Sequence, residues 1–204
     1  MKTEKILEKM FLMQALEDGA RDALLIEFIN ELKVELLKDE AKRSGKAQAK
    51  KAADNIIKQF KNIGRDSGAF IDEEGRQIIG GRYSAVRLYD ALPVEELPKN
   101  AAKIDFNRFI DEAEKNAGAR LTLPSAEKLS AYIKSEKAAH RGERGYKVLW
   151  DFGEGLPITD ATLLLDMIYL LPDATCTAAA RSVYGMLYFK SITGDGVLMP
   201  CRRP

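Results

Sequence analysis

Residues 161–171, ATLLLDMIYLL, and residues 195–202, DGVLMPCR, decide the fold class that we predict for this chain. The first stretch is a short apolar helix with one acid, Asp166, near its centre. Thr159 or Asp160 can cap this helix, since short polar side chains accept hydrogen bonds from the first unpaired backbone N–H groups. The second stretch is an apolar strand that ends in Met-Pro-x-Arg. The chain therefore closes with a helix, a polar turn-rich segment and a final strand.

This ending resembles the last domain of a bacterial DNA polymerase sliding clamp, which has a helix of the form LLDxxxxL and a final strand that reads roughly VMPxR. The resemblance is clear over about 45 residues and loose over the rest of the C-terminal part. It implies an α+β domain, which in this family is one of six in a ring around DNA. This chain has room for one such domain. Its predicted helices at 105–116 and 160–171 carry more acids than bases, so we do not expect a DNA-encircling ring.

The pattern from residue 66 onward indicates mixed strands and helices. Alternating or continuous apolar runs between turn signals predict strands, and Asp105 and Ser125 are predicted N-caps of two further helices. The glycine-containing segment 191–196 is expected to form the last hairpin turn. An order of strands, helix, helix, strand, helix and strands favours an α+β fold with an antiparallel sheet. The predicted strands are 69–71, 76–79, 82–89, 146–152, 174–178, 186–190 and 196–199.

The N-terminal residues 1–64 are predicted to be helical. Three amphipathic patterns follow one another, and Gly45 is expected to separate the second from the third. The second pattern is the strongest, because apolar residues recur there with helical spacing from residue 20 to residue 36. We therefore predict two domains, a helical region at 1–64 and a clamp-like α+β domain at 65–204. The N-terminal helices are expected to mediate self-association of the chain into a homo-oligomer.

Positive charge is concentrated in one segment. The whole chain has a net charge of +1, whereas residues 38–65 hold nine Lys or Arg against three Asp or Glu. Two interpretations stay open: a surface that contacts phosphates, or a solvated helix face on which lysine is the usual outward residue. The candidate nucleic-acid-binding residues of this segment are Lys42, Arg43, Lys46, Lys50, Lys51, Lys58 and Lys61.

Two further segments are candidate interaction sites. The loop 134–147 is rich in bases and contains two glycines, which predicts a mobile segment; its Arg141 and Arg144 are candidate nucleic-acid contacts, and an ordinary solvated loop is the alternative. The strand 82–89 places Tyr83, Arg87 and Tyr89 on one face, which suits a partner-binding surface. A face packed under the N-terminal helices is the alternative for this strand.

The sequence holds no catalytic motif. Its single histidine, His140, lies in a charged loop, and its two cysteines, Cys176 and Cys201, have no metal-ligand spacing. The acids Asp72-Glu73-Glu74 lie in a predicted hairpin turn, where acids are common. Neither a phosphate-binding P-loop nor a dinucleotide-binding glycine motif occurs. We expect a protein that is not an enzyme and that needs no cofactor or metal.

The sequence therefore predicts a non-catalytic binding protein that acts on or near DNA through a basic helix and loop, of phage or mobile-element origin. Its expected partner is nucleic acid, foremost DNA, or a protein that handles nucleic acid. The alternative is a protein-directed inhibitor or adaptor, such as a phage anti-CRISPR protein that blocks an RNA-guided nuclease. The chain has no apolar run long enough to cross a membrane and no signal-peptide-type apolar region at its N-terminus. It has two cysteines and no supported disulfide, so we expect a reduced, cytoplasmic protein.

Overall fold

The computed structural model describes residues 8–13, 18–61, 68–97, 104–179 and 185–201. The chain forms two compact units, Met1–Ala47 and Gln48–Pro204. The predicted boundary at residue 64 differs from this division, because helix α3 (Ala47–Lys61) lies almost wholly in the second unit. Among the described helices, none combines the length and the apolar composition needed to span a bilayer.

The described residues of the first unit include two helical segments that run antiparallel to each other, residues 8–13 and α2 (Asp18–Arg43). Helix α2 contains the second predicted amphipathic pattern, residues 20–36. Lys9 Nζ lies 2.9 Å from Glu31 Oε1 and 3.3 Å from Glu27 Oε1. The predicted break at Gly45 is confirmed: this residue has a φ of 71°, and the N–H groups of Gly45 and Lys46 bond back to the last turn of α2. This pattern of bonds is the Schellman motif that glycine favours at helix ends.

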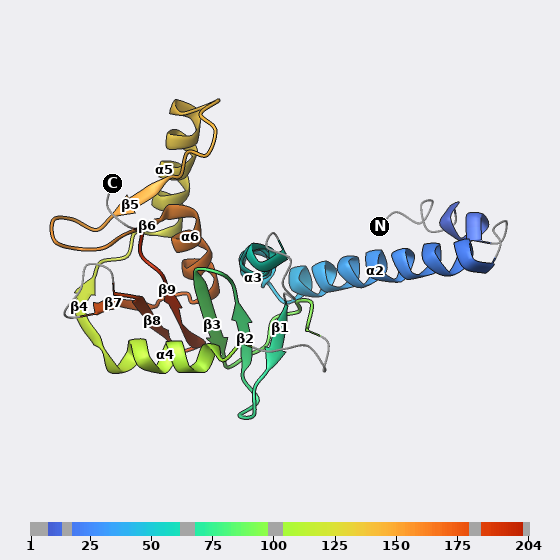
Figure 1. Ribbon diagram of the computed structural model, residues 1–204, viewed down its shortest axis with the longest axis horizontal. Coiled ribbons are helices and arrows are strands. Elements are labelled where there is room, and N and C mark those ends of the chain that lie inside the picture. Colours follow the sequence, from blue (N-terminus) through green and yellow to red (C-terminus); the bar gives the residue numbers. More distant parts are fainter. Residues whose placement is uncertain (1–7, 14–17, 62–67, 98–103, 180–184, 202–204) are drawn as a thin grey trace. The chain divides into compact units, whose positions relative to one another are not determined.

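The second unit is built on a seven-stranded antiparallel sheet with the strand order β1-β2-β3-β9-β8-β7-β4, which confirms the predicted α+β class (Figure 1). Strands β5 and β6 form a separate two-stranded sheet, and both occur in the chain after α5 and before α6. The strands are β1 (Ala69–Ile71), β2 (Gln77–Gly80), β3 (Ser84–Leu88), β4 (Ala117–Leu121), β5 (Leu149–Asp151), β6 (Ile158–Asp160), β7 (Thr175–Ala179), β8 (Leu187–Ser191) and β9 (Gly194–Leu198).

The predicted capping residues are confirmed. Asp105, Ser125 and Asp160 accept hydrogen bonds from backbone N–H groups in the first turns of α4 (Phe106–Lys115), α5 (Ala126–Ala139) and α6 (Ala161–Leu170).

Two strands of the structure, β4 and β6, were not predicted from the sequence. The turn expected at 191–196 is also shorter than predicted, because Gly194 and Gly196 lie inside β9. A Cβ atom on Gly196 would come within 2.6 Å of the Ala85 carbonyl oxygen, so glycine permits the close pairing of β9 with β3.

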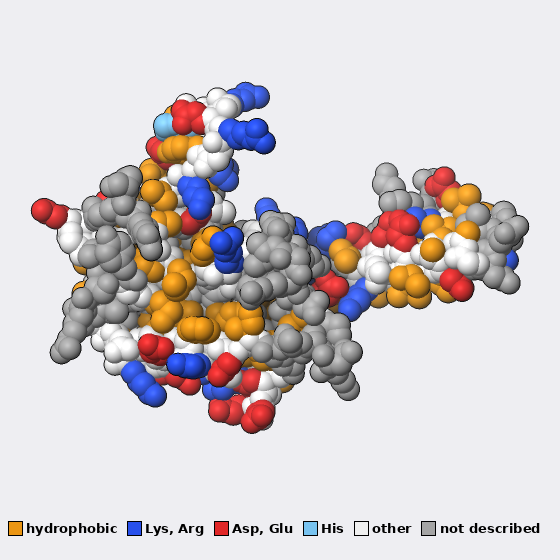
Figure 2. All heavy atoms as spheres, in the orientation of Figure 1, with side chains coloured by type: hydrophobic (Ala, Val, Ile, Leu, Met, Phe, Trp, Pro, Cys, Tyr) orange, Lys and Arg blue, Asp and Glu red, His pale blue; other side chains and the backbone are white. Residues whose placement is uncertain are grey.

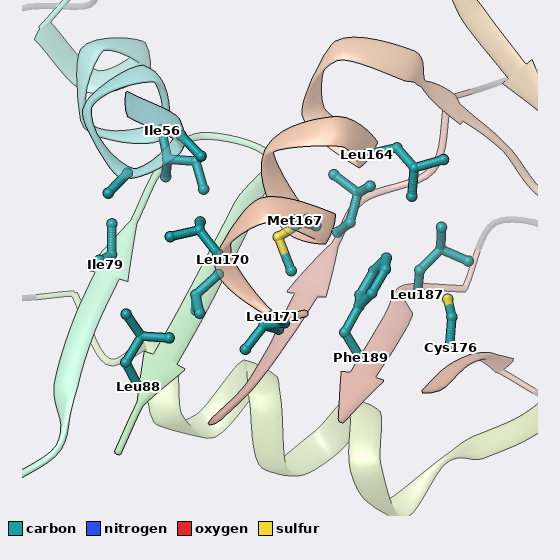
Figure 3. Packing of buried hydrophobic residues seen from close by; sticks show 14 of the residues in the cluster. Ile56, Ile79, Leu88, Leu164, Met167, Leu170, Leu171, Cys176, Leu187 and Phe189 are labelled. Atoms are coloured by element: carbon teal, nitrogen blue, oxygen red, sulfur yellow. The ribbon is translucent and has the colours of Figure 1, made fainter. Parts of the chain in front are cut away.

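Helices cover both faces of this sheet (Figure 1). One face packs against α3 and α6 and forms the main apolar core, with Phe189, Met167 and Leu164 at its centre (Figure 3). Helix α5 packs on α6 and extends this core with Leu129 and Ile133. The other face packs against α4 through a small cluster that includes Ile110, Ala85 and Val197. Neighbouring residues of β3 and β9 point to opposite faces, as strand geometry requires. The main core therefore holds α3, α5 and α6 in place on one side of the sheet.

One carboxyl group is buried beside the main core. Asp166 of α6 is 6% exposed and accepts a hydrogen bond from Asn55 Nδ2 of α3 at 3.1 Å. Burial raises the pKa of Asp166 to about 7, although the hydrogen bond from Asn55 acts in the opposite direction. A carboxyl group loses its hydration when it is buried, so the neutral form is favoured there.

Replacement of this group by an uncharged amide tests its buried state. Between the ordinary pKa of 3.8 and the folded value of about 7, the folded chain holds a proton on Asp166 that the unfolded chain has released. The free energy of unfolding therefore falls as pH rises through this window. We expect Asp166→Asn to lack this loss and to be more stable than the native chain at pH 8, by up to a few kcal/mol, but not at pH 4. Urea unfolding at both pH values measures the difference, and an identical pH dependence of the two proteins would contradict it.

Candidate nucleic-acid interface

Helix α3 is amphipathic and presents lysines away from the core. Ala53 and Ile56 are fully buried in the main core, whereas Lys51 and Lys58 are exposed. The apolar side attaches the helix to the sheet, so the exposed lysines are held on a fixed support. Of the predicted nucleic-acid-binding residues, Lys51 and Lys58 are therefore the ones that the structure describes as exposed on α3.

Lys50 differs from its neighbours. Its side chain is buried, and its Nζ atom lies 2.8 Å from Asp54 Oδ2, one helical turn further along α3. A buried, ion-paired ammonium group would have to leave its partner before it could contact a phosphate, and this costs free energy. Lys50 therefore acts as a structural residue of α3 in this conformation.

The remaining bases of the predicted segment lie elsewhere. Lys42, Arg43 and Lys46 belong to the first unit, where Lys42 Nζ is 3.7 Å from Asp39 Oδ1. The side chain of Lys61 lies outside the described residues. The candidate site is consequently built from residues of the second unit alone.

The predicted loop at 134–147 is shorter than expected, because residues 134–139 belong to α5 and only the segment after the helix is a loop. This loop is closed by its own contacts, although its glycines had suggested a mobile segment. His140 ends the helix, and Gly142 and Gly145 adopt φ values of 97° and 83°, which favour glycine. The Glu143 N–H donates to the His140 carbonyl oxygen, and the Tyr146 N–H donates to the Glu143 carbonyl oxygen. Two successive turns thus return the chain toward α5.

An aromatic stack closes this loop. The rings of His140 and Tyr146 lie parallel, with 3.9 Å between their centroids and 16° between their planes. The Tyr146 hydroxyl donates a hydrogen bond of 2.6 Å to Glu136 Oε2, and this bond raises the pKa of Tyr146 to about 12. Glu143 Oε1 lies 3.0 Å from His140 Nδ1. Glu136 of α5 and Glu143 of the loop are therefore both engaged with the aromatic pair.

The basic side chains of the same segment are exposed. Among the described residues, none forms an ion pair with Lys134, Lys137, Arg141 or Arg144. Figure 2 shows Lys and Arg side chains gathered at the end of α5, close to the single histidine. We call these four residues the α5 basic cluster. These bases outnumber the two acids of the same segment, and both acids are engaged with His140 or Tyr146, so this end of the unit has a positive surface.

The predicted partner-binding surface on strand 82–89 is exposed only in part. Tyr83 and Tyr89 flank β3 and are 39% and 52% exposed, whereas Arg87 is 5% exposed and lies between the sheet and α4. Arg87 Nε and Nη2 donate to the two carboxylate oxygens of Asp195 at 2.8 and 2.6 Å, and Nη1 donates to Asp111 at 2.9 Å. Hydrogen bonds to Asp195 raise the pKa of Arg87 further above its ordinary value. The face that carries Arg87 is therefore packed, and α4 rather than the N-terminal helices covers it.

The acids at 72–74 lie in the turn between β1 and β2, where the sequence predicted a hairpin turn, and Asp72 stabilises this turn. Asp72 Oδ1 accepts hydrogen bonds from the N–H groups of Glu74 and Arg76, and Oδ2 accepts from Arg76 Nε and Asn107 Nδ2. Burial would raise the pKa of Asp72, but these hydrogen bonds lower it to about 2. A pocket of about 420 Å³ adjoins the turn, with Asp72, Glu73, Glu74 and Asp105 in its wall. In the described ranges, no three His, Cys, Asp or Glu side chains are grouped as metal ligands.

Comparison of the chain with protein-family models, with curated proteins and with solved structures finds no match. The candidate interface is therefore argued from the residues and contacts of this chain alone. Sequence reasoning named Arg141 and Arg144 but did not foresee the pairing of His140 with Tyr146. A histidine at a helix end, followed by two glycines and a tyrosine within six residues, is the signal that could have indicated a closed loop.

The buried pair of Arg87 and Asp195 gives a prediction on stability. Asp195→Asn leaves the Arg87 guanidinium group buried with only part of its charge compensated, and we expect the free energy of unfolding to fall by about 3–5 kcal/mol. Lys190→Gln is the control, because it breaks an exposed ion pair with Glu114 and should cost less than about 1 kcal/mol. Denaturant unfolding of both variants measures this, and equal losses would contradict the assignment.

Proposed function

We propose that this chain is a non-catalytic nucleic-acid-binding protein that contacts the phosphate backbone of DNA with the α5 basic cluster. The observation that carries the proposal is the excess of exposed bases at the end of α5. Glu136 and Glu143 are engaged with the His140–Tyr146 pair, while Lys134, Lys137, Arg141 and Arg144 are exposed and form no ion pair with any described residue. Exposed bases without acidic partners release counterions when they meet phosphates, which favours binding.

The two sides of the sheet differ in charge, and this difference supports the proposal. Lys51 and Lys58 of α3 belong to the side that also carries α5, since both helices pack on the same apolar core. The opposite side carries α4, with more acids than bases, and the acidic turn at 72–74. A polyanion would thus be attracted to the α3–α5 side and repelled from the α4 side.

The expected mode of binding is independent of nucleotide sequence. Lys and Arg side chains that contact phosphates position a protein on nucleic acid but do not read bases. The aromatic rings of the loop are stacked on each other, which ties them to loop structure. The likeness of the C-terminal residues to a sliding-clamp domain stays a hypothesis, and the proposed DNA contact does not depend on it.

Charge reversal tests the proposal. We expect the double variant Arg141→Glu/Arg144→Glu to weaken binding of a labelled DNA duplex at least tenfold, because two phosphate contacts are lost. The slope of log K against log salt concentration should decrease by about 2. Fluorescence anisotropy at low and moderate salt measures both quantities, with single-stranded DNA and RNA titrated in parallel.

The matched control is Arg108→Glu/Lys115→Glu on α4, which changes the net charge by the same amount at two exposed positions on the other side of the sheet. This variant should keep nearly native affinity. If both double variants weaken DNA binding equally, the affinity depends on the net charge of the protein and not on the α5 basic cluster, which would contradict the proposed site. No binding by the native chain at low salt would overturn the proposal and favour the protein-directed inhibitor or adaptor, for which a pull-down of protein partners is the next step.

A further inference from the structure

The first unit exposes a continuous apolar stripe on α2. Leu25, Ile29 and Leu36 are 42%, 52% and 68% exposed, and Leu32 between them is half-buried. Their spacing along the chain is four, three and four residues, which places all four side chains on one side of a helix. This alternation of three and four is the pattern by which one α-helix packs on another in a coiled coil. We call these four residues the α2 seam.

The seam has defined ends. Asp22 precedes Leu25 by three residues, and Asp39 follows Leu36 by three residues, so an acid stands at each end of the apolar stripe. The full spacing from Asp22 to Asp39 is three, four, three, four and three. Because this pattern is the same in both directions, an antiparallel copy of the seam matches it layer by layer, with Leu25 opposite the partner's Leu36 and Ile29 opposite the partner's Leu32.

The other helix of the unit does not occupy the seam. Lys9 of the helical residues 8–13 pairs with Glu27 and Glu31 of α2. With about 100° of rotation per residue, Glu27 and Glu31 lie on the side of α2 that is turned away from the seam. The intramolecular contact thus leaves the seam open, in agreement with the exposure of its side chains.

We propose that the α2 seam is the dimerisation surface of this protein and that its occupant is the α2 seam of a second copy in antiparallel orientation. The apolar layers match in length, and in this register Asp22 stands opposite the partner's Asp39. Lys42 and Arg43 of the last turn of α2 lie within about one helical turn of Asp39, so each end of the antiparallel pair combines two acids with two bases. A parallel partner would instead place these bases beside their own copies, which is unfavourable.

The charges of α2 disfavour a membrane as the occupant. Helices that lie on membrane surfaces carry a polar face rich in Lys and Arg, which is attracted to anionic lipids. α2 holds seven Asp or Glu against five Lys or Arg in its 26 residues. The inference is independent of the proposed DNA contact, because the seam belongs to the first unit and the α5 basic cluster to the second.

Sedimentation velocity of the full chain over a range of concentrations tests the proposal. We expect a reversible monomer–dimer equilibrium for the native protein. Ile29→Glu, which puts a charge in the middle of the seam, should raise the dimer dissociation constant at least tenfold. Val34→Glu is the matched control, because Val34 is 45% exposed on the opposite side of the same helix, and it should leave the equilibrium unchanged.

Circular dichroism of each variant confirms that the helices are retained. A native chain that is monomeric at all concentrations would overturn the proposal. Equal loss of dimer in the Ile29→Glu and Val34→Glu variants would also overturn it, since the association would then not depend on the seam.

Cross-linking tests the orientation. In a Cys201→Ser background, with Cys176 buried, one protein carries Asp22→Cys and a second carries Asp39→Cys. An antiparallel dimer predicts that mixed oxidation yields chiefly the disulfide between the two different chains. Predominant disulfides between like chains would contradict the antiparallel arrangement.

Discussion

The buried ion pair between Arg87 and Asp195 is the contact on which the rest of the second unit depends. The two residues face each other across β3 and β9 and are 108 positions apart in the chain. Their pairing joins the three-stranded antiparallel segment β1-β2-β3 to the C-terminal strands β9-β8-β7. A bidentate contact between guanidinium and carboxylate groups is geometrically demanding. It therefore fixes the register: a slip by one residue would turn Asp195 from the α4 side into the main apolar core, where it would have no partner.

A fixed register assigns the two faces of the sheet. The side chains of Val86, Leu187, Phe189 and Leu198 build the main core, and α6 packs on it through Leu164 and Met167. Helix α5 packs on the same core through Leu129 and Ile133. The loop at the end of α5 then presents its bases from a helix that is itself anchored in the core. The position of the candidate interface is thus a consequence of packing that begins at the centre of the sheet.

Local features of the fold could be predicted from the sequence. The caps Asp105, Ser125 and Asp160 act within their own first helical turn, and the β1–β2 hairpin is set by a short glycine-containing turn, so both are encoded locally. Strand β4, with the sequence AGARL, has little intrinsic strand preference and forms because β7 offers it an edge. The burial of Arg87 and the pairing of Lys50 with Asp54 depend on partners or surroundings that periodicity does not reveal. For the same reason, the bases at the end of α5 could be named from the sequence, whereas the contacts of Glu136 and Glu143 with Tyr146 and His140 could not.

We propose that DNA lies against the end of α5, and chemical footprinting can test this position. The native chain is acetylated on lysine in the presence and absence of a DNA duplex and analysed by mass spectrometry, because lysines are present on both sides of the sheet. We expect DNA to protect Lys134 and Lys137 from acetylation and to leave Lys115 of α4 as reactive as in the free protein. Protection of Lys115 without protection of Lys134 and Lys137 would contradict it.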